Sequence, residues 1–488
     1  MTPTIAPLLF FSLLILPQLI TSYYTSHIRE SRQFFVRSSD DAGASSSPEP
    51  ASCSSIASGL SNGKLPVVHR LSPCSPLNGA ERNSNPLPTG RLRHAQRLRS
   101  LFAARPGVAD SATAPAPPAG VTIPTNITST PQQPDEQVYT VFVGFGTPAQ
   151  QLPLGLTNSG LGISSLWCKP CAFGAPNCDP AFDTTRSSTF ARVPCGSPGC
   201  RSNCSGSVCL LPYPEKGTLV QDVLTLTPTA RVHDFTFGCV VHTTNHTLRR
   251  PTVGELDLSR DSRSLPSRLA ASLGGTPDFS YCLPRSPSSH GFLSFGAGGR
   301  RERSGDRVRH APLVHNPEFP NHYLIEVVGI SLGGEDLPIP AAAQIANTTA
   351  LRVGDLGVEM NYIKSAVYAP LRDAFRRKMS RYPTDDWIRT GDAFEELDVC
   401  YNFTGLHEIE VPLVEFKFGN GESLLLEASQ MMSYVDPSAG PFSVACLAFY
   451  PLPYNNSPIA VIGTLAQTST EVVYDVAGGK VGFIPHSC

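Results

Sequence analysis

The sequence predicts an all-β protein, and its composition, strand patterning and length all support that prediction. Proline (46 residues) and glycine (40 residues) are abundant and long amphipathic helical repeats are few, which favours a fold rich in strands and turns. A chain of 488 residues exceeds what one hydrophobic core usually supports, so two or more folding units are expected. The net charge of −2 gives no broad electrostatic field, so neither nucleic acid nor an anionic membrane is a predicted partner.

The first 136 residues differ in character from the rest of the chain. Residues 1–22 hold an apolar run that two prolines interrupt and that is short for a membrane span, so a secretory signal peptide is predicted. No Lys or Arg precedes the run, which leaves a signal anchor as the alternative. Residues 23–136 are rich in Ser, Pro, Ala and Arg, with a basic helix expected at 91–102 and a linker at 111–134. We interpret 23–136 as a propeptide-like region; for its first half, a disordered extension is an equal alternative.

Strand and turn patterns begin at residue 139. Apolar and polar residues alternate over 139–146, as in a strand with one buried face. Further strands are expected at 223–226, 235–239, 291–295, 323–330 and 411–418. The pair Asn420-Gly421 between apolar runs predicts a hairpin turn. One helix is expected from 365 to 379, with a solvated basic face and apolar residues at every fourth position: Val367, Leu371, Phe375 and Met379.

Fourteen cysteines, twelve of them at or after Cys168, predict an oxidising compartment and a disulfide framework. Nine lie between Cys168 and Cys282 and three follow from Cys400, so complete pairing of the twelve requires a disulfide between the two groups. A zinc site at Cys168-x-x-Cys171 is disfavoured because no suitable His spacing follows, and no metal or other cofactor is predicted. Six sequons are candidates for N-glycosylation: Asn126, Asn203, Asn245, Asn347, Asn402 and Asn455.

The segment around residue 158 carries a family resemblance. Residues 146–171 contain, in order, a Gly-Thr-Pro turn, an apolar strand, the tetrapeptide Asn158-Ser159-Gly160-Leu161, a Trp and a Cys-x-x-Cys pair. This order resembles the first catalytic segment of the plant pepsin-like aspartic peptidases, in the nepenthesin-like branch and the chloroplast-nucleoid-protease-like subgroup. Further segments agree in order as far as residue 488, over about 350 residues. The resemblance implies a bilobal, all-β, pepsin-like acid protease fold with a few short helices and an active site between the lobes.

The resemblance also implies boundaries and disulfides. After a signal peptide at 1–22 and the propeptide-like region and linker at 23–136, the N-terminal lobe would span 137–320 and the C-terminal lobe 321–488. The implied disulfides are Cys168–Cys171, Cys178–Cys239, Cys195–Cys209, Cys200–Cys204, Cys400–Cys446 and Cys282–Cys488. The last of these would cross between the lobes.

An aspartic peptidase needs two carboxylates that share one proton, because close like charges cannot both ionise. The resemblance puts the second aspartate at Asp355, but the position of the first is Asn158. A carboxamide cannot carry the negative charge or the shared proton. Of the four hydroxyls expected in the two motifs only that of Ser159 remains. The other three positions are Leu161, Leu356 and Val358.

Other parts of the family pattern are altered too. The position of the flap tyrosine is Cys209, which leaves Tyr213 as a weak substitute for contacting substrate. A glycine that lets strands pass closely behind the dyad is replaced by Asp257, whereas its C-terminal counterpart, Gly463, is intact.

Two functions remain open. In the first, the protein is a secreted, catalytically impaired relative that binds a peptide or protein, or acts as an inhibitor. In the second, it is an acid endopeptidase that uses Asp355 with a compensating group, or with an aspartate regenerated by deamidation of Asn158. A product without a selected role is a third reading. We expect a monomer, free of the membrane after signal removal, that passes through the secretory pathway to the extracellular space (apoplast or cell wall) or the vacuole.

Overall fold

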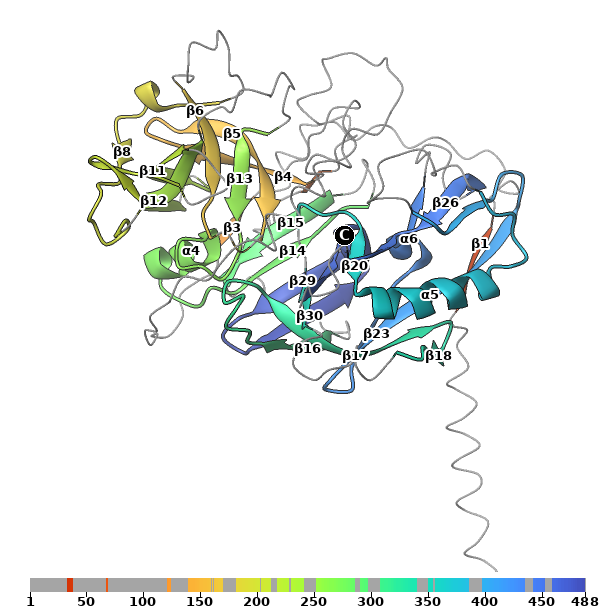
Figure 1. Cartoon of the computed structure of the whole chain (residues 1–488). Helices are drawn as coiled ribbons and strands as arrows, with labels where there is room; N and C mark the ends of the chain where they lie inside the picture. The colour runs from red at the N-terminus through yellow and green to blue at the C-terminus, as the bar shows by residue number, and fades with distance from the viewer. Residues whose placement is uncertain are drawn as a thin grey trace, which may run out of the picture.

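A computed structural model describes most of the chain from residue 139 onward and three short segments before it. The described residues are 33–37, 67–68, 121–123, 139–158, 160, 162–169, 181–201, 203–211, 217–227, 230–240, 252–285, 290–296, 308–339, 350–353, 356–385, 397–434, 442–452 and 459–487. Strands dominate them, and the described α-helices are α4 (Leu265–Leu273), α5 (Ser365–Lys378) and α6 (Ala428–Met431). Figure 1 shows two lobes, with α4 in the upper-left lobe and α5 in the lower-right lobe. The predicted all-β, bilobal fold is confirmed.

The N-terminal lobe is built on one eight-stranded sheet. Its strands, in spatial order, are β12 (Arg231–Val240), β11 (Gly217–Thr225), β4 (Thr140–Phe145), β5 (Gln150–Thr157), β13 (Gly254–Asp257), β6 (Ser165–Lys169) and β7 (Phe182–Asp183), with β8 (Ala191–Arg192) beside β11. A separate hairpin pairs β9 (Cys204–Ser205) with β10 (Val208–Cys209). Buried aromatic rings pack edge to face on this sheet, with 5.0 Å between the ring centroids of Phe145 and Phe237. This packing holds β4 against β12, and β4 in turn pairs with β5, the strand that leads into residue 158.

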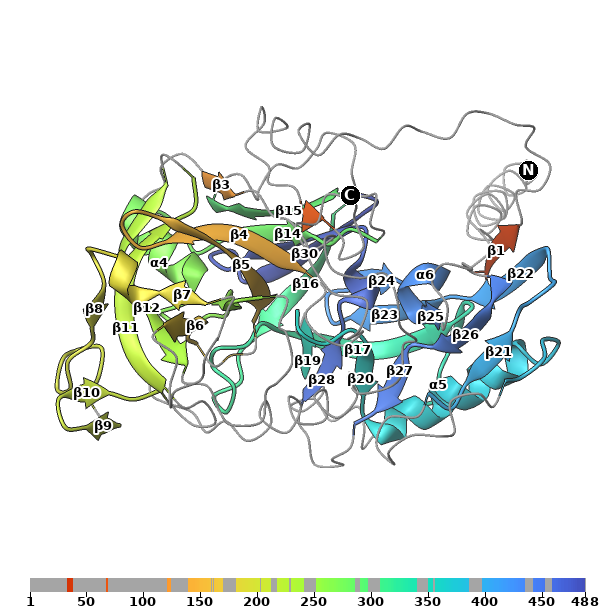
Figure 2. The ribbon, with the colours of Figure 1, turned by 90° about the horizontal axis from the view of Figure 1, so that it is seen from above.

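A larger sheet continues from the interlobe region into the C-terminal lobe. Its order is β2 (Val67–Val68), β15 (His290–Phe295), β14 (Phe279–Cys282), β29 (Thr470–Asp475), β30 (Lys480–Pro485), β16 (Arg309–Val314), β17 (Leu324–Leu332), β19 (Ala350–Val353), β28 (Ile459–Ile462), β20 (Asn361–Ile363) and β27 (Phe449–Pro451). Strand β3 (Val121–Ile123) pairs with β15, β18 (Glu335–Asp336) and β23 (Val414–Phe418) pair with β17, and β24 (Ser423–Leu425) pairs with β23. Seen from above in Figure 2, β14, β15 and β30 lie in the middle of the molecule.

Two smaller sheets complete the C-terminal lobe among the described residues. One contains β21 (Cys400–Asn402), β26 (Val444–Leu447) and β25 (Met432–Tyr434), and the other pairs β1 (Gln33–Arg37) with β22 (Glu408–Pro412). Short 3-10 turns occur at Thr184–Arg186 and Leu465–Gln467.

A buried polar network ties the interlobe sheet to the loop that follows β28. The hydroxyl of Tyr281 on β14 donates to Oε1 of Gln467 at 2.5 Å, and the ring of Phe279 stacks on Tyr474 with centroids 4.4 Å apart. Nε2 of Gln467 then donates to the carbonyl of Gly463 at 3.0 Å. The loop that contains Gly463 is therefore anchored in the part of the core that joins the lobes.

Most local predictions are confirmed. The expected strands correspond to β4, β11, β12, β15 and β17, and the expected helix is α5. The Asn420-Gly421 turn connects β23 to β24, with Gly421 at φ +80°. The single strand predicted over 411–418 is wrong, because the structure divides it into β22 and β23. Pro412, which ends β22, has no N–H to donate to a ladder. The basic helix predicted at 91–102 lies outside the described residues.

The disulfide pairing differs from the implied pattern. The described disulfides are Cys168–Cys239, Cys195–Cys204, Cys200–Cys209 and Cys400–Cys446, which confirms only the last. The pairings Cys168–Cys171, Cys178–Cys239, Cys195–Cys209 and Cys200–Cys204 are wrong. The parallel neighbours β6 and β12 bring Cys168 and Cys239 to a Cα distance of 5.4 Å, within disulfide range. Sγ of Cys200 lies 3.9 Å from Sγ of Cys204 in the adjacent disulfide. The implied pairing therefore joined two sulfurs that are neighbours in space, although each is bonded to a different partner. Cys282 is disulfide-bonded; Cys171, Cys178 and Cys488 lie outside the described residues.

Removing the Cys400–Cys446 disulfide is expected to destabilise the C-terminal lobe. It joins β21 to β26 across a sequence separation of 46 residues. The chain-entropy relation for a loop of that size gives a loss of about 4 kcal/mol in the free energy of unfolding for Cys400→Ala/Cys446→Ala. Urea denaturation of the double variant and the wild type would measure the loss, and superimposable curves would contradict the expectation.

Candidate active site

The same four-strand arrangement occurs once in each lobe. In the N-terminal lobe β13 runs parallel to β5 and antiparallel to β6, and β6 is parallel to β12. In the C-terminal lobe β28 runs parallel to β19 and antiparallel to β20, and β20 is parallel to β27. The Cα partners are also equivalent, since Leu156 pairs with Leu256 and Val353 pairs with Ile462. The loops that leave β5 and β19 thus occupy equivalent places in the two lobes.

Hydrogen bonds behind the two loops support the same equivalence. The N–H of Asp257 donates to Oγ of Ser164, and the N–H of Gly463 donates to Oδ1 of Asn361, both at 3.0 Å. Ser164 follows Asn158 by six residues, and Asn361 follows Asp355 by six. This equal spacing supports the frame in which positions 158 and 355 correspond, although Asp355 itself lies outside the described residues.

The side chain of Asn158 connects the two lobes. Asn158 follows β5 directly and is only 2 % exposed. Its Oδ1 accepts a hydrogen bond from the backbone N–H of Leu356 at 3.4 Å, across 198 residues of sequence. The carboxamide at the position of the first aspartate is therefore engaged with the backbone of the second motif.

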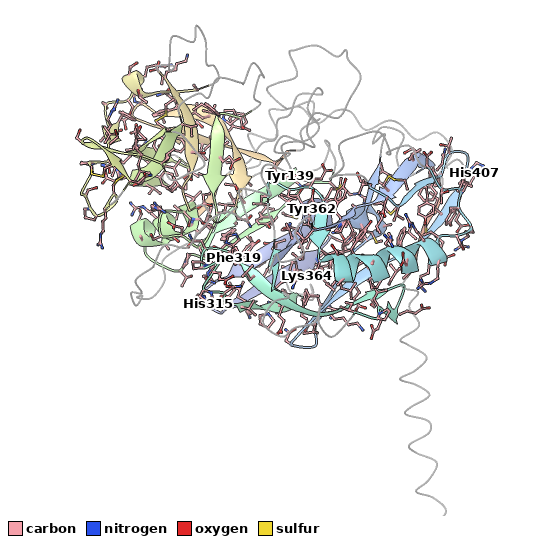
Figure 3. The ribbon with its side chains drawn as sticks, in the orientation of Figure 1. Tyr139, His315, Phe319, Tyr362, Lys364 and His407 are labelled. Carbon is pink, nitrogen blue, oxygen red and sulfur yellow. A yellow bond between two sulfur atoms is a disulfide. The ribbon has the colours of Figure 1, made fainter. Side chains whose placement is uncertain are left out.

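Apolar side chains fill two positions where the family pattern has hydroxyls. Leu356 is 1 % exposed and Val358 is fully buried. Val358 belongs to an apolar cluster with Tyr362 and Tyr450, whose rings stack with centroids 5.3 Å apart. Figure 3 labels Tyr362 near the centre of the molecule. These contacts favour apolar packing beside the second motif. Ser159, Leu161 and the flap candidate Tyr213 lie outside the described residues, so their roles stay predictions.

Asn158→Ala is expected to expose the hydrogen-bonding role of this side chain. Truncation leaves the buried N–H of Leu356 without its carboxamide acceptor, and an unsatisfied buried donor costs about 1–3 kcal/mol. Amide exchange of a peptide covering residues 356–360 should accelerate by about 5- to 150-fold, because each 1.4 kcal/mol changes an opening equilibrium about tenfold. Unchanged exchange in this peptide would show that the bond contributes nothing to joining the lobes.

Asp257 stands at the position that is equivalent to Gly463 in the C-terminal lobe, where only glycine fits. A Cβ built on Gly463 would lie 2.2 Å from the carbonyl oxygen of Glu359 and 2.3 Å from that of Met360. Asp257 carries a Cβ at the equivalent place and is 1 % exposed. The loop at 158–164 therefore cannot approach β13 as closely as the loop after residue 355 approaches β28.

Burial raises the pKa of Asp257 to about 7, because desolvation disfavours the charged carboxylate. Hydrogen bonds from Ser259 act in the opposite direction: the hydroxyl donates to Oδ2 at 2.7 Å and the N–H to Oδ1 at 3.2 Å. In the sequence Asp257 is visible only as the replacement of a glycine, whereas in the structure it is a buried titratable group directly behind the first motif.

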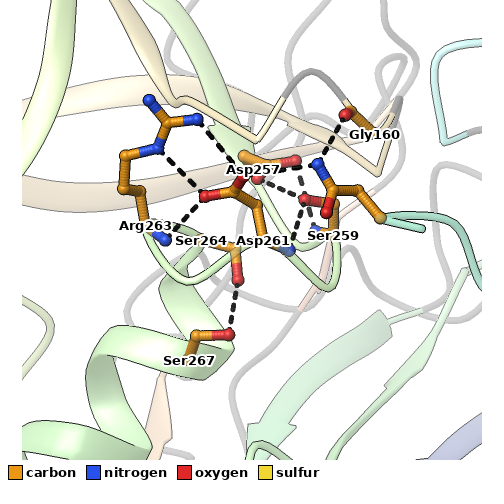
Figure 4. A network of polar contacts seen from close by, with 8 residues as sticks. Gly160, Asp257, Ser259, Asp261, Arg263, Ser264 and Ser267 are labelled. Atoms are coloured by element: carbon orange, nitrogen blue, oxygen red, sulfur yellow. Dashed lines mark hydrogen bonds and ion pairs between the residues drawn. The ribbon is translucent and has the colours of Figure 1, made fainter. Parts of the chain in front are cut away.

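Residues between β13 and α4, and residues just before β17, contact the same loop (Figure 4). The Asp261 carboxylate accepts from Nε of Arg263 at 3.0 Å and from Nδ2 of Asn321 at 3.3 Å. Nδ2 of Asn321 also donates to the carbonyl of Gly160 at 3.3 Å. The ring of His322 packs so closely on Gly160 that a Cβ there would lie 2.2 Å from its Cε1, so only glycine fits. Sequence reasoning missed Asn321 and His322 because they reach Gly160 only through the fold.

Among the described residues, no group of three or more His, Cys, Asp or Glu side chains is arranged to hold a metal ion. Within the same residues, none of the helices is long and apolar enough to cross a bilayer.

A bilobal β-protein with one such loop per lobe belongs to the class of pepsin-like proteins. Residues 139–297 match the family described as "Xylanase inhibitor N-terminal", and residues 322–485 match "Xylanase inhibitor C-terminal". The chain is 33% identical over 360 residues to aspartyl protease AED1 of Arabidopsis thaliana, covering 72% of each protein. It is 26% identical over 375 residues to aspartic proteinase nepenthesin-2 of Nepenthes gracilis, covering 74% of this chain and 80% of that protein.

Solved structures agree at the level of the fold. Basic 7S globulin from soybean aligns with a TM-score of 0.54 at 20% identity, covering 71% of this chain and 92% of that one. Conglutin gamma from lupine seeds aligns with a TM-score of 0.56 at 19% identity, covering 75% and 95%. With the sequence matches, these findings show that the chain belongs to the plant pepsin-like aspartic peptidase family.

Proposed function

We propose that this member of the family is catalytically impaired and binds a protein or peptide between its lobes instead of hydrolysing it. The observation that carries the proposal is the hydrogen bond between Oδ1 of Asn158 and the N–H of Leu356. A pepsin-type dyad needs one carboxylate to accept a proton from water and a second carboxyl group to polarise the peptide carbonyl. At position 158 a carboxamide cannot accept the proton from water, and it has no acidic proton to share with Asp355.

The surroundings of the motifs support the same proposal. The buried side chains of Leu356 and Val358 have no hydroxyl to orient a catalytic carboxylate. Asp257 adds a bulky buried group where close packing behind the first motif is expected. Loss of a positioned general base alone typically lowers a rate about 10²–10⁴-fold. Several changes around the same loops leave little basis for efficient hydrolysis.

An inhibitor-like role is one form of this binding function. Both family descriptions that match the chain refer to xylanase inhibitors, which supports a partner that is itself a secreted enzyme. In this proposal the protein is a monomer of the extracellular space or vacuole, with a signal peptide at 1–22 and a propeptide-like region at 23–136.

The second candidate function is an acid endopeptidase that relies on Asp355. The names of the relatives favour it, since AED1 and nepenthesin-2 are both called proteases or proteinases. Such an enzyme would need a group other than Asn158, or a deamidated Asn158, to supply the missing carboxylate.

Proteolysis of a denatured protein substrate by the mature form between pH 2.5 and 6, with and without pepstatin, separates the two functions. We expect no pepstatin-sensitive cleavage, because one dyad member is absent. Calorimetric titration with pepstatin on the same preparation reports whether the region between the lobes still takes a peptide-like ligand. Cleavage that pepstatin abolishes would refute the binding-only proposal and establish the peptidase.

A further inference from the structure

Asp257 holds both ends of the loop at 158–164. It ends β13 opposite Thr157, the residue before Asn158, and the N–H of the following residue, Leu258, donates to the Thr157 carbonyl at 2.7 Å. The N–H of Asp257 itself donates to Oγ of Ser164 at the far end of the loop. The backbone at residues 257 and 258 therefore fixes both ends of the loop that carries Asn158, and the buried carboxyl group of Asp257 lies directly behind that loop.

The carboxyl group of Asp257 is neutralised by no ion pair within the described residues. Its hydrogen-bond donors are the hydroxyl and N–H of Ser259, and Oγ of Ser259 in turn accepts from the N–H of Asp261. Asp261 and Arg263 face it from the following turn, with opposite effects on its charge, and Tyr323 lies close enough to interact with it electrostatically. Through Asp261 and Asn321 this network returns to the carbonyl of Gly160, on the other side of the same loop (Figure 4).

We propose that Asp257 is a pH-dependent latch: uncharged in acidic solution, it keeps the loop at 158–164 tightly packed, and its ionisation loosens the loop as the solution approaches neutrality. This inference concerns the folded N-terminal lobe and holds whether the protein cleaves peptides or only binds them. Asp257, which stands where the family pattern has a glycine, thereby acquires a regulatory role.

The direction of the effect follows from proton linkage. A buried carboxylate without a cation is costly, so the closed loop retains a proton that the opened loop releases. The pKa of Asp257 is raised from 3.8 to about 7 in the folded state. Stabilisation by this group is therefore complete below about pH 4 and is lost progressively up to about pH 7. The opening equilibrium of the loop should rise by up to about tenfold per pH unit across that window.

Two other titratable groups lie against this loop: His322, whose ring packs on Gly160, and Asp261, whose carboxylate lies beside Gly162. Of these, the imidazole of His322 is the one that would gain a charge in acid. If protonation of this buried imidazole controlled the loop, acid would open it, because a buried cation is costly. Asp257 and His322 therefore predict opposite dependence on pH.

Amide hydrogen exchange of the full chain between pH 4.5 and 7.5 tests the latch. Protection of peptides covering 158–164, corrected for the intrinsic pH dependence of exchange, should fall by up to about tenfold per pH unit in the wild type. Asn at position 257 does not titrate, so Asp257→Asn should give a flat profile. The matched internal control is the C-terminal counterpart at 356–363, behind which Gly463 lies, where wild type and variant should agree.

A second variant keeps the test decisive if Asp257→Asn does not fold. The Ser259 hydroxyl lowers the pKa of Asp257, so Ser259→Ala should shift the wild-type profile toward higher pH. An identical fall in protection in Asp257→Asn, a profile unmoved by Ser259→Ala, or loss of protection on acidification would each overturn the latch; the last would assign control to His322.

Discussion

Restoring both catalytic motifs is expected to raise acid proteolysis by about two to four orders of magnitude, the range associated with a positioned general acid or base. The variant combines Asn158→Asp, Leu161→Ser, Leu356→Thr and Val358→Thr with Asp257→Gly. The first change returns the carboxylate, the next three return hydroxyls that orient the dyad, and the last lets the N-terminal loop approach β13. The rate of pepstatin-sensitive cleavage of a denatured protein at pH 3–5 measures the gain.

Partial restorations show which change matters. Asn158→Asp alone is expected to gain less than the full set, because the buried Leu356 and Val358 still offer the dyad no hydroxyl. Adding Asp355→Asn to the restored variant should return it to the wild-type level. A fully restored, folded variant that remains silent would place the defect elsewhere, for example at Cys209, which stands at the position of the flap tyrosine.

The second large effect is a difference between the two lobes: a side chain is accommodated at position 257 but not at the equivalent position 463. Gly463→Ala puts a Cβ 2.2 Å from the Glu359 carbonyl oxygen, so backbone must move and we expect a loss of about 3 kcal/mol or more in the free energy of unfolding. Asp257→Gly removes a side chain from a loop already arranged around it. Its cost should stay near the 0.5–1 kcal/mol typical of added backbone freedom.

Urea denaturation of Gly463→Ala and Asp257→Gly at pH 7 compares the two positions directly. Near this pH the ionisation of the buried Asp257 offsets part of the stability that its packing contributes, so removing its side chain costs least. The two variants should therefore differ most in their free energies of unfolding at this pH. Equal losses would contradict the inference that the two loops follow different paths behind the motifs.

Local sequence patterns were sufficient to predict most of the fold. The spacing of Val367, Leu371 and Phe375 gave α5, because a helix repeats its buried face on that period. Alternation over 139–146 gave β4, because successive side chains of a strand point to opposite faces. The break between β22 and β23 was missed because an apolar run masks the single residue, Pro412, that interrupts the ladder.

Long-range contacts could not be predicted in the same way. The pairing of Cys168 with Cys239 depends on two parallel strands becoming neighbours across a separation of 71 residues, which spacing does not encode. For the site, motif order gave the position of Asn158 but not the partner of its side chain. The contacts of Asn321 and His322 with Gly160 depend on the lobes folding together. The sequence did show Asp257 in place of a glycine behind the first motif. Its effect on the path of the loop at 158–164 became clear only from the equivalent position in the C-terminal lobe, where Gly463 has no room for a Cβ.

The most direct test of catalytic impairment compares wild type with Asp355→Asn in one assay. Both proteins, prepared identically, would be incubated with a denatured protein substrate at pH 2.5–6, and new peptide termini would be counted by mass spectrometry. Because the dyad already lacks its first carboxylate, we expect the same background count for both proteins. A reproducibly higher, pepstatin-sensitive count for the wild type would show that Asp355 still supports hydrolysis and that the protein is not catalytically impaired.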